Sequence, residues 1–421
     1  MYLRYPVKLK NSLFENIFSM LTLRGLEYIL SFLLVPYLLR VLGPANFGAV
    51  AFMQGVIVYF NLFIDYGFNL TAPRALARAS QNEISILFST FMWAKLILLV
   101  IISVTFCFIL WMADSLQLIE IDWRLFGAVY ITVIGNVFFP VWFFQGIQQM
   151  RYITIINLIG RTFSILCIFA FVSSADDYIL AAFFQSFTPF AAGILSLALI
   201  AHKFSGIFCR PNLRKIKQAF KEAWQIFISN LAISLYTNTD IVLLGLLTNN
   251  TIVGYYSGAD KLLNCIKRGI SAINDAIYPY ISQMFKRDYP KAISFLKKQL
   301  LVYAIGGTVG GIVILAGAPV VIPWLLGNQY IHSIRPLQIM AFVPLIVSFS
   351  NIFGYETMLP LGMEKIYSRI LLLASTLNIA IIIPFIMIYQ ENGVSAAILI
   401  TELFVTVIMG VILRKKDILV H

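Results

Sequence analysis

Residues 85–112 read SILFSTFMWAKLILLVIISVTFCFILWM, an apolar run in which Lys95 is the only charged residue. Wound as an α-helix, a run of this length rises about 42 Å, more than the roughly 30 Å hydrocarbon core of a bilayer. The whole chain of 421 residues has this character, because 60% of it is hydrophobic and only 12% is charged. Soluble domains carry about 25% charged residues. The sequence therefore predicts an all-α polytopic membrane protein.

Twelve stretches are long and apolar enough to count as membrane-spanning helices, taking about 20 residues as one span. They cover residues 13–39, 46–69, 85–112, 125–147, 152–173, 178–202, 222–247, 252–284, 299–321, 337–360, 367–389 and 393–412. The boundary between the fourth and fifth is the weakest, since only Gln148, Gln149 and Arg151 interrupt the apolar run.

Basic residues concentrate on one side of the alternating loops. If the N-terminus is cytoplasmic, the cytoplasmic segments carry 22 Lys and Arg, and the opposite side carries three, Arg40, Arg124 and Arg335. The positive-inside rule then places both the N- and the C-terminus in the cytoplasm. The net charge of +12 is thus a signal of topology, and we expect no nucleic-acid partner.

The chain also repeats itself at an offset of 206 residues. The shift superposes three landmarks on their counterparts: Phe14 on Phe220, Gly48 on Gly254 and Pro73 on Pro279. We therefore expect an N-lobe over residues 1–204 and a C-lobe over 220–421, each with six helices, joined by a basic cytoplasmic linker over 205–219. Because six helices separate equivalent points, both lobes would enter the membrane in the same orientation.

Six basic residues lie inside the predicted spans: Arg24, Lys95, Arg161, Lys261, Lys267 and Arg268. Facing lipid, they would together cost on the order of 15 to 20 kcal/mol, so we expect them to face carboxylates or a water-filled cavity that holds an anion. The alternatives are pairing of Arg24 with Glu27, snorkelling of Lys95 to the headgroups, and a structural ion pair for Lys267 or Arg268.

The repeat aligns a polar face in the two lobes. Gln54, Asn61, Asp65 and Asn69 share one face of the second helix, and adding 206 gives Asp260, Lys267, Ser271 and Asp275 on the eighth. This alignment predicts that the first, second, seventh and eighth helices line a wet cavity between the lobes. The buried carboxylates that are candidates for binding H⁺ or Na⁺ are Asp65, Asp240, Asp260 and Asp275.

Short motifs resemble a known family. Residues 140–150 read PVWFFQGIQQM and resemble the W-x-F-Q-G-x-x-x-M signature of bacterial O-antigen translocases. Residues 35–48 resemble the end of their first helix, and Asp65-Tyr66-Gly67 fits the same pattern. The resemblance covers most of the chain. It identifies the chain as a member of the polysaccharide transport branch of the multidrug/oligosaccharidyl-lipid/polysaccharide (MOP) flippase superfamily, with two six-helix lobes in a MATE/MOP-like fold.

The resemblance implies a flippase of the bacterial inner membrane. Such a protein moves a polyprenyl-pyrophosphate-linked oligosaccharide, an O-antigen or similar repeat unit, from the cytoplasmic to the periplasmic leaflet by alternating access. Its implied partners are that glycan, membrane lipids, a polysaccharide polymerase and a chain-length regulator. The six cations would bind pyrophosphate oxygens. Aromatic side chains, with Trp142, Tyr236, Tyr255 and Tyr256 as candidates, would stack on sugar rings.

Other functions remain open from the sequence. A cation-coupled drug exporter of the same superfamily would share the lobes, although cationic substrates do not suit cationic membrane residues. A membrane-embedded polysaccharide polymerase would need a larger loop, and an assembly factor would need no cavity charge. There is no Gly-x4-Gly-Lys-Ser/Thr motif, and the three histidines, His202, His332 and His421, are scattered. We therefore expect no catalytic residues, no metal site and no cofactor.

Overall fold

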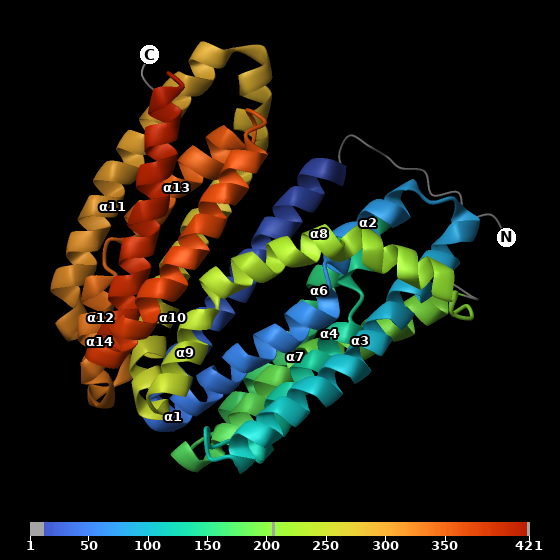
Figure 1. The fold of residues 1–421 in the computed structure, drawn as a ribbon, viewed down its shortest axis with the longest axis horizontal. Helices are drawn as coiled ribbons and strands as arrows, with labels where there is room; N and C mark the ends of the chain where they lie inside the picture. The colour runs from blue at the N-terminus through green and yellow to red at the C-terminus, as the bar shows by residue number, and fades with distance from the viewer. Residues whose placement is uncertain (1–11, 204–206, 419–421) are drawn as a thin grey trace. The chain divides into compact units, whose positions relative to one another are not determined.

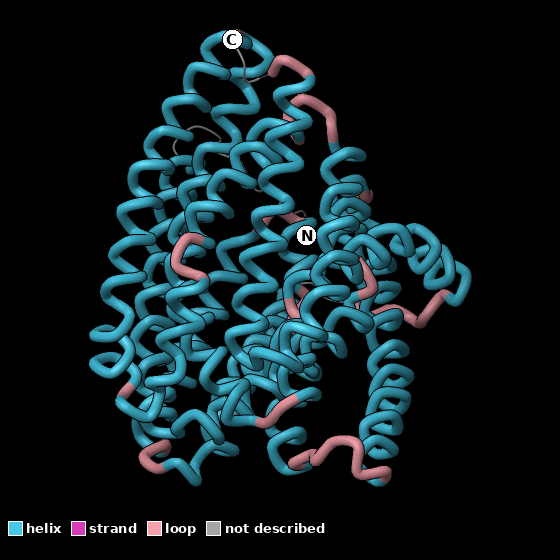
Figure 2. The backbone as a smooth tube through the Cα atoms, turned by 60° about the vertical axis from the view of Figure 1, so that its left-hand side comes forward, coloured by secondary structure: helices cyan, strands magenta, loops and turns pink. Residues whose placement is uncertain are grey.

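The computed structural model describes residues 12–203 and 207–418, and within them the side chains of all residues except 12–32, 81, 82, 236 and 276. The described residues form helices joined by loops and turns, with no β-strand among them (Figures 1 and 2). The helices, in chain order, are α1 (Ser12–Asp65), α2 (Phe68–Arg78), α3 (Gln81–Ser115), α4 (Trp123–Phe138), α5 (Val141–Gly146), α6 (Met150–Phe171), the short 3₁₀ helix η1 (Ala175–Asp177), α7 (Tyr178–Lys203), α8 (Leu213–Thr237), α9 (Thr239–Leu247), α10 (Asn250–Arg287), α11 (Tyr289–Leu326), the 3₁₀ helix η2 (Asn328–Ser333), α12 (Ile334–Ile339), α13 (Val343–Asn351), the π-helix η3 (Ile352–Met358) and α14 (Glu364–Lys415).

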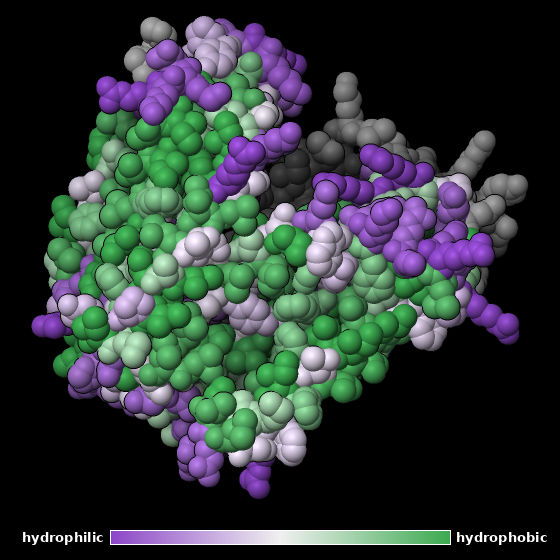
Figure 3. All heavy atoms as spheres, in the orientation of Figure 1, coloured by the Kyte–Doolittle hydropathy of each residue, from purple (hydrophilic) through white to green (hydrophobic). Residues whose placement is uncertain are grey.

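The prediction of a helical membrane protein is confirmed. Among the described residues, seven helices are long and apolar enough to cross a membrane, and nine if two bent helix pairs each count as one span. The outer surface of α3 is typical, because Val100, Val104 and Phe108 are more than half exposed. Figure 3 shows hydrophobic residues over most of the face in view and hydrophilic residues gathered near helix ends. Apolar side chains exposed in this way suit contact with lipid.

Several helix boundaries have local causes. Two predicted boundaries are confirmed as kinks: the gap at 40–45 contains the break in α1 at Gly43 (φ 71°, ψ 171°), and the gap at 390–392 contains the break in α14 at Gln390 (φ 50°, ψ −124°). The fourth predicted span divides into α4 and α5 at Pro140, which has no N–H to continue the helical ladder. The predicted break before the fifth span is confirmed, since α5 ends at Gly146 and α6 begins at Met150.

The chain forms two compact units. Unit 1 comprises Met1–Val35 and Val56–Asn230, and unit 2 comprises Pro36–Gly55 and Leu231–His421. The last part of the predicted 205–219 linker is helical, because α8 begins at Leu213. Ile216, Ala219 and Ala223 on α8 are buried in the core of unit 1. Their spacing of three and four residues gives α8 an apolar stripe that the basic composition of this segment concealed.

The core of unit 1 is built around the Trp-Phe-Phe sequence of α5. Trp142, Phe143 and Phe144 are at most 1% exposed, and the Trp142 ring lies 5.6 Å from that of Phe88 on α3, centroid to centroid. A Cβ atom on Gly146 would come within 2.6 Å of the Leu76 side chain on α2. The signature segment is therefore a packing motif. The predicted stacking of Trp142 on a sugar is wrong, because its ring has no accessible face.

Hydrogen bonds at the helix ends also fix α4 against α7. The Asp122 carboxylate accepts hydrogen bonds from the backbone N–H groups of Arg124 and Leu125, and its other oxygen accepts one from the Tyr178 hydroxyl at 2.6 Å. Burial raises the pKa of Asp122, but these hydrogen bonds to the charged form outweigh burial, so the pKa lies below its ordinary value. Asp122 is thus a charged N-cap at neutral pH.

In unit 2, two glycines related by the 206-residue repeat pack against each other's helix. A Cβ on Gly48 would lie 1.7 Å from the carbonyl oxygen of Asn250, and a Cβ on Gly254 would lie 1.9 Å from that of Pro44. The contacts are reciprocal, since positions 44 and 250 are themselves 206 residues apart. No side chain fits at either position, so these glycines set the close approach of α1 to the start of α10.

Candidate functional site

The buried cation Lys95 is neutralised by a carboxylate. Lys95 is 1% exposed on α3, and its Nζ lies 2.5 Å from Oδ1 of Asp65 at the end of α1. The second oxygen of Asp65 accepts a hydrogen bond from Asn69 Nδ2 at 2.6 Å. Both oxygens of Asp65 are therefore occupied within unit 1, and Lys95 does not extend to the membrane surface.

The other predicted cations of unit 1 are Arg24 and Arg161. The Arg24 side chain lies outside the described residues. Arg161 is half-buried on α6 and already has an interaction partner. Of the three intramembrane cations predicted for unit 1, Arg161 is thus the one whose described side chain is partly accessible and separate from the Lys95–Asp65 pair.

The remaining three predicted cations lie on α10 of unit 2. Lys261 and Lys267 are half-buried and Arg268 is exposed. The apolar stripe of this helix, which includes Val253, Ala259 and Leu263, is completely buried. Farther along α10, Ser271 and Asp275 are exposed, whereas Tyr256 is 2% exposed. The predicted stacking of Tyr256 on a sugar is therefore wrong, while the predicted polar positions of α10 stay at least partly accessible.

A carboxylate cluster joins three helices of unit 2. Asp240 on α9 is 7% exposed and interacts electrostatically with Asp260, Lys267 and Glu402, the last on α14. Asp260 accepts a hydrogen bond from Asn264 at 2.7 Å. Oδ1 of Asp240 has no hydrogen-bond partner within the described part of the chain. Asp260 and Glu402 thus repel the charged form of the buried Asp240 carboxylate, and Lys267 attracts it. Asp275, by contrast, is exposed near the far end of α10.

Glu402 and Glu356 are not among the site residues predicted from the sequence. Glu402 was one intramembrane carboxylate among several, and only the packing of α14 against α9 brings it to Asp240. Glu356 is fully buried on the π-helix η3, where its Oε1 accepts a hydrogen bond from Gln299 at 3.1 Å. Its Oε2 has no partner among the described residues. A π-helical turn changes which face a residue presents, and no periodicity in the sequence revealed it.

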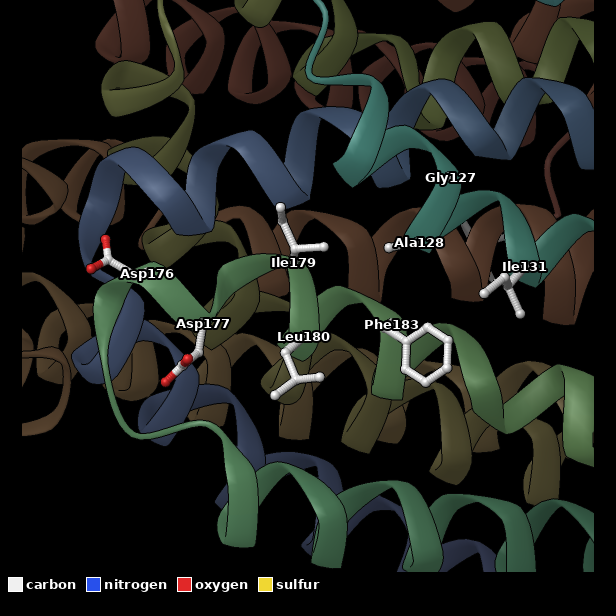
Figure 4. Close-up of a pocket in the computed structure, with 8 residues that line it drawn as sticks. All are labelled: Gly127, Ala128, Ile131, Asp176, Asp177, Ile179, Leu180 and Phe183. Atoms are coloured by element: carbon white, nitrogen blue, oxygen red, sulfur yellow. The ribbon is translucent and has the colours of Figure 1, made fainter.

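An apolar hollow lies between α4 and α7 of unit 1, with a volume of about 550 Å³ (Figure 4). Ile179, Leu180 and Phe183 line it from α7, and Asp176 and Asp177 lie at one end. Asp177 accepts hydrogen bonds from the backbone N–H groups of Ser173 and Ser174, so it caps the turn before α7. None of the predicted cations lines this hollow, and its two carboxylates would repel a phosphate.

Comparison with known proteins gives matches over almost the whole chain. A family model described as "Polysaccharide biosynthesis protein" matches residues 13–285. A protein of Escherichia coli (strain K12) named "Putative O-antigen transporter" is 31% identical over 417 residues, which cover 98% of this chain and 99% of the relative. A protein of the same name from Shigella dysenteriae is 30% identical, with 94% and 98% of the two chains covered.

Solved membrane transporters share the fold. The lipid II flippase MurJ in its inward closed conformation superposes with a TM-score of 0.70 at 11% identity, covering 96% of this chain and 89% of that one. A MATE family transporter of the MOP superfamily, in its inward-facing conformation, gives 0.65 at 14% identity, covering 92% and 94%. At such low identity these two matches establish the helical membrane fold alone. The relatives carry the names of transporters and flippases, and none is named as an enzyme.

Proposed function

The chain belongs to the polysaccharide biosynthesis protein family, and we propose that it translocates a polyprenyl-pyrophosphate-linked oligosaccharide from the cytoplasmic to the periplasmic leaflet of the bacterial inner membrane. The observation that carries this proposal is the similarity, along nearly the entire chain, to a relative named as an O-antigen transporter. The fold shared with MurJ and with a MATE transporter suits a membrane transporter, and the cargo rests on the relative's name.

The cation set supplies the chemistry that such a cargo needs. A pyrophosphate crossing the hydrocarbon region must exchange water for other donors, and Arg and Lys provide charge-assisted hydrogen bonds. Lys261, Lys267 and Arg268 lie within one stretch of α10 and are at least partly accessible. Together with Arg24 and Arg161 of unit 1, they are our proposed pyrophosphate ligands. Lys95 is in an ion pair with Asp65, which favours a structural role for this residue.

We further propose that the chain crosses the membrane twelve times, with both termini cytoplasmic and alternating access between two lobes. Length and composition give nine spans among the described residues. The breaks at Gly43 and Gln390 each divide one of these long helices into two spans, which makes eleven. The twelfth is α10, whose 38 residues are long enough to span but carry too many polar side chains to resemble an ordinary lipid-facing helix. A span of that kind suits the wall of a polar pathway.

The carboxylate cluster of unit 2 is our proposed site of ion coupling. Binding of H⁺ or Na⁺ at Asp240 would relieve the repulsion that Asp260 and Glu402 exert on this buried carboxylate. Asp65 is a weaker candidate than these, because Lys95 and Asn69 occupy its oxygens. Asp275 remains a candidate on α10. Replacing Asp240 with Asn should uncouple transport from the ion gradient while leaving the protein in the membrane, which a gradient-dependence assay in vesicles can check.

The test of the proposed function uses a strain that lacks the gene. Loss of the gene should remove the surface polysaccharide and leave a lipid-linked glycan on the cytoplasmic leaflet. Lys267→Ala and Arg268→Ala should lower surface polymer about tenfold or more, since a hydrogen bond to a charged group contributes roughly 1.5–3 kcal/mol. Lys286→Ala, an exposed cation in the last turn of the same helix, is the matched control and should have no effect.

Two results would overturn the proposal. Normal surface polymer in the deletion strain would remove the transport role altogether. Normal polymer combined with altered drug resistance would instead favour a cation-coupled exporter of the same superfamily. A variant can also lose polymer because less of it reaches the membrane. The amount of each variant in the membrane is therefore measured together with the surface polymer.

A further inference from the structure

A basic and aromatic pocket lies at the start of α8 in unit 1. Its volume is about 600 Å³, and its lining residues are Tyr66, Arg214, Lys217, Gln218, Phe220, Lys221 and Trp224. None of these cations belongs to the intramembrane set from the sequence, because this segment reads as a linker and the first turns of a span. The pocket is therefore separate from the proposed translocation residues.

Helical spacing brings the three cations to one side of the pocket. Arg214, Lys217 and Lys221 are separated by three and four residues, which places them along one face of α8. All three are exposed, and among the described residues neither of the two salt bridges involves their side chains. Two carboxylates lie near this segment but do not line the pocket: Glu222 accepts a hydrogen bond from Gln218, a lining residue, and Glu83 accepts one from Ser80. The pocket thus has three positive charges and no lining carboxylate.

The aromatic wall of the pocket is held rigidly in place. Tyr66 has a left-handed backbone (φ 46°), which is uncommon for a residue other than glycine, and Gly67 follows at φ 81°. The Tyr66 ring stacks on Phe227 at 4.6 Å with an interplanar angle of 10°, and meets Phe220 edge-on at 5.1 Å. A Cβ on Gly67 would come within 2.9 Å of the Ile226 side chain. The turn before α2 is therefore clamped against α8, with the Tyr66 ring as part of the pocket wall.

Trp224 lies on α8 between the basic residues that line the pocket and the apolar part of the helix. It is 51% exposed, and it follows the basic first turns and precedes the apolar run that ends in α9. Tryptophan at such a boundary is typical of the interface between water and lipid. Basic residues on the water side of this boundary suit the phosphate groups of lipid headgroups.

We propose that this pocket binds the phosphate or diphosphate headgroup of a membrane lipid at the cytoplasmic surface. Arg214, Lys217 and Lys221 hold the phosphate oxygens, while Tyr66 and Trp224 contact the first carbons or sugar beyond them. Two lipids share this chemistry, an anionic phospholipid and a polyprenyl diphosphate. The site does not depend on the proposed translocation of a glycan, because either lipid would occupy it in a protein that transports something else.

The test is a binding measurement on the purified full-length protein in detergent. The probes are short-chain phosphatidylglycerol, farnesyl diphosphate and inorganic diphosphate, each titrated by isothermal calorimetry. The pocket variant is the double substitution Lys217→Gln/Lys221→Gln. The matched control, Arg210→Gln/Lys215→Gln, removes two exposed charges from the same segment that do not line the pocket. Equal thermal unfolding of all three proteins establishes that the variants are folded.

The pocket variant should weaken binding of at least one lipid probe by about tenfold or more, whereas the control should change it by less than about threefold. Trp224→Ala should weaken the lipid probes and leave inorganic diphosphate unchanged. The lipid that binds more tightly identifies the natural source of the headgroup. An equal loss in the two double variants would overturn the proposal, since it would reduce the effect to general surface charge. Binding of inorganic diphosphate alone would likewise exclude a lipid site.

Discussion

At the scale of single residues, the basic residues inside the predicted spans have two different environments. Lys95 is buried and paired, with its Nζ 2.5 Å from Asp65, whereas Lys267 and Arg268 are at least partly accessible. The sequence alone gives all three as basic residues inside apolar spans. Lys95 differs from the other two because it pairs with Asp65, which lies 30 residues away on another helix. No local pattern in the sequence connects these two residues.

The Lys95–Asp65 pair gives the first prediction. Lys95→Met leaves Asp65 without its counter-ion, and because the Asp65 side chain is 35% exposed, we expect a cost of about 1–3 kcal/mol. The level of folded protein, measured by fluorescence-detected size exclusion in detergent, should fall strongly. Adding Asp65→Leu should restore much of it, because no charge is then left unpaired. If Lys95→Met instead kept a normal level and abolished transport, Lys95 would act on the substrate.

The second prediction concerns Trp142, which is completely buried. Trp142→Ala should destabilise the protein by about 3–5 kcal/mol through the cavity that it leaves, and Trp142→Phe by less. The measurement is the thermal unfolding midpoint of the purified variants. A sugar-binding tryptophan would behave differently, with unchanged stability and reduced transport in both variants.

At the scale of helices, the approach of α1 to α10 depends on Gly48 and Gly254. Each glycine faces a backbone carbonyl of the other helix. An added Cβ would lie 1.7 Å from that carbonyl oxygen at Gly48 and 1.9 Å from it at Gly254. Backbone atoms cannot move aside as flexible side chains do, so a methyl group at either position must push the helices apart.

The third prediction follows from this contact. Gly48→Ala and Gly254→Ala should each lower stability by about 1–3 kcal/mol, the usual cost of overpacking. Gly269→Ala is the matched control on α10, since an added Cβ there meets nothing within 4 Å. The control should gain up to about 1 kcal/mol from the better helix propensity of alanine. Equal behaviour of all three variants in thermal unfolding would contradict the close packing of these helices.

The helices themselves were largely predictable, and their exact limits were not. Apolar length located all the long helices, and the gap at Gln148–Gln149 was found. The breaks at Gly43 and Gln390 lie inside the predicted gaps at 40–45 and 390–392, although the sequence did not show that each is a single-residue kink in a continuous helix. The burial of α8 from Ile216 onward was hidden by its surrounding lysines, and the pocket beside Tyr66 exists only because a left-handed turn meets that helix.

At the scale of the whole molecule, the family and the fold are established by comparison, and the transported substrate is our proposal. Polar residues at 206-residue intervals pointed to α10 as the main cationic helix, and three of the six predicted cations lie there. The sequence had no means of showing that Asp240, Asp260 and Glu402 interact, since they come from three helices. Such clusters arise from tertiary packing rather than from any local pattern.

The most direct measurement is transport by the purified protein in liposomes. A fluorescent polyprenyl-pyrophosphate-linked oligosaccharide is placed in the inner leaflet, and its arrival in the outer leaflet is followed by an added glycosidase that cannot cross the membrane. We predict rapid glycosidase access with the wild-type protein, and access about a hundredfold slower or more with Lys267→Ala/Arg268→Ala, since each lost charged hydrogen bond contributes roughly 1.5–3 kcal/mol. Access at the rate of protein-free liposomes, with wild-type protein folded and an ion gradient present, would contradict this prediction.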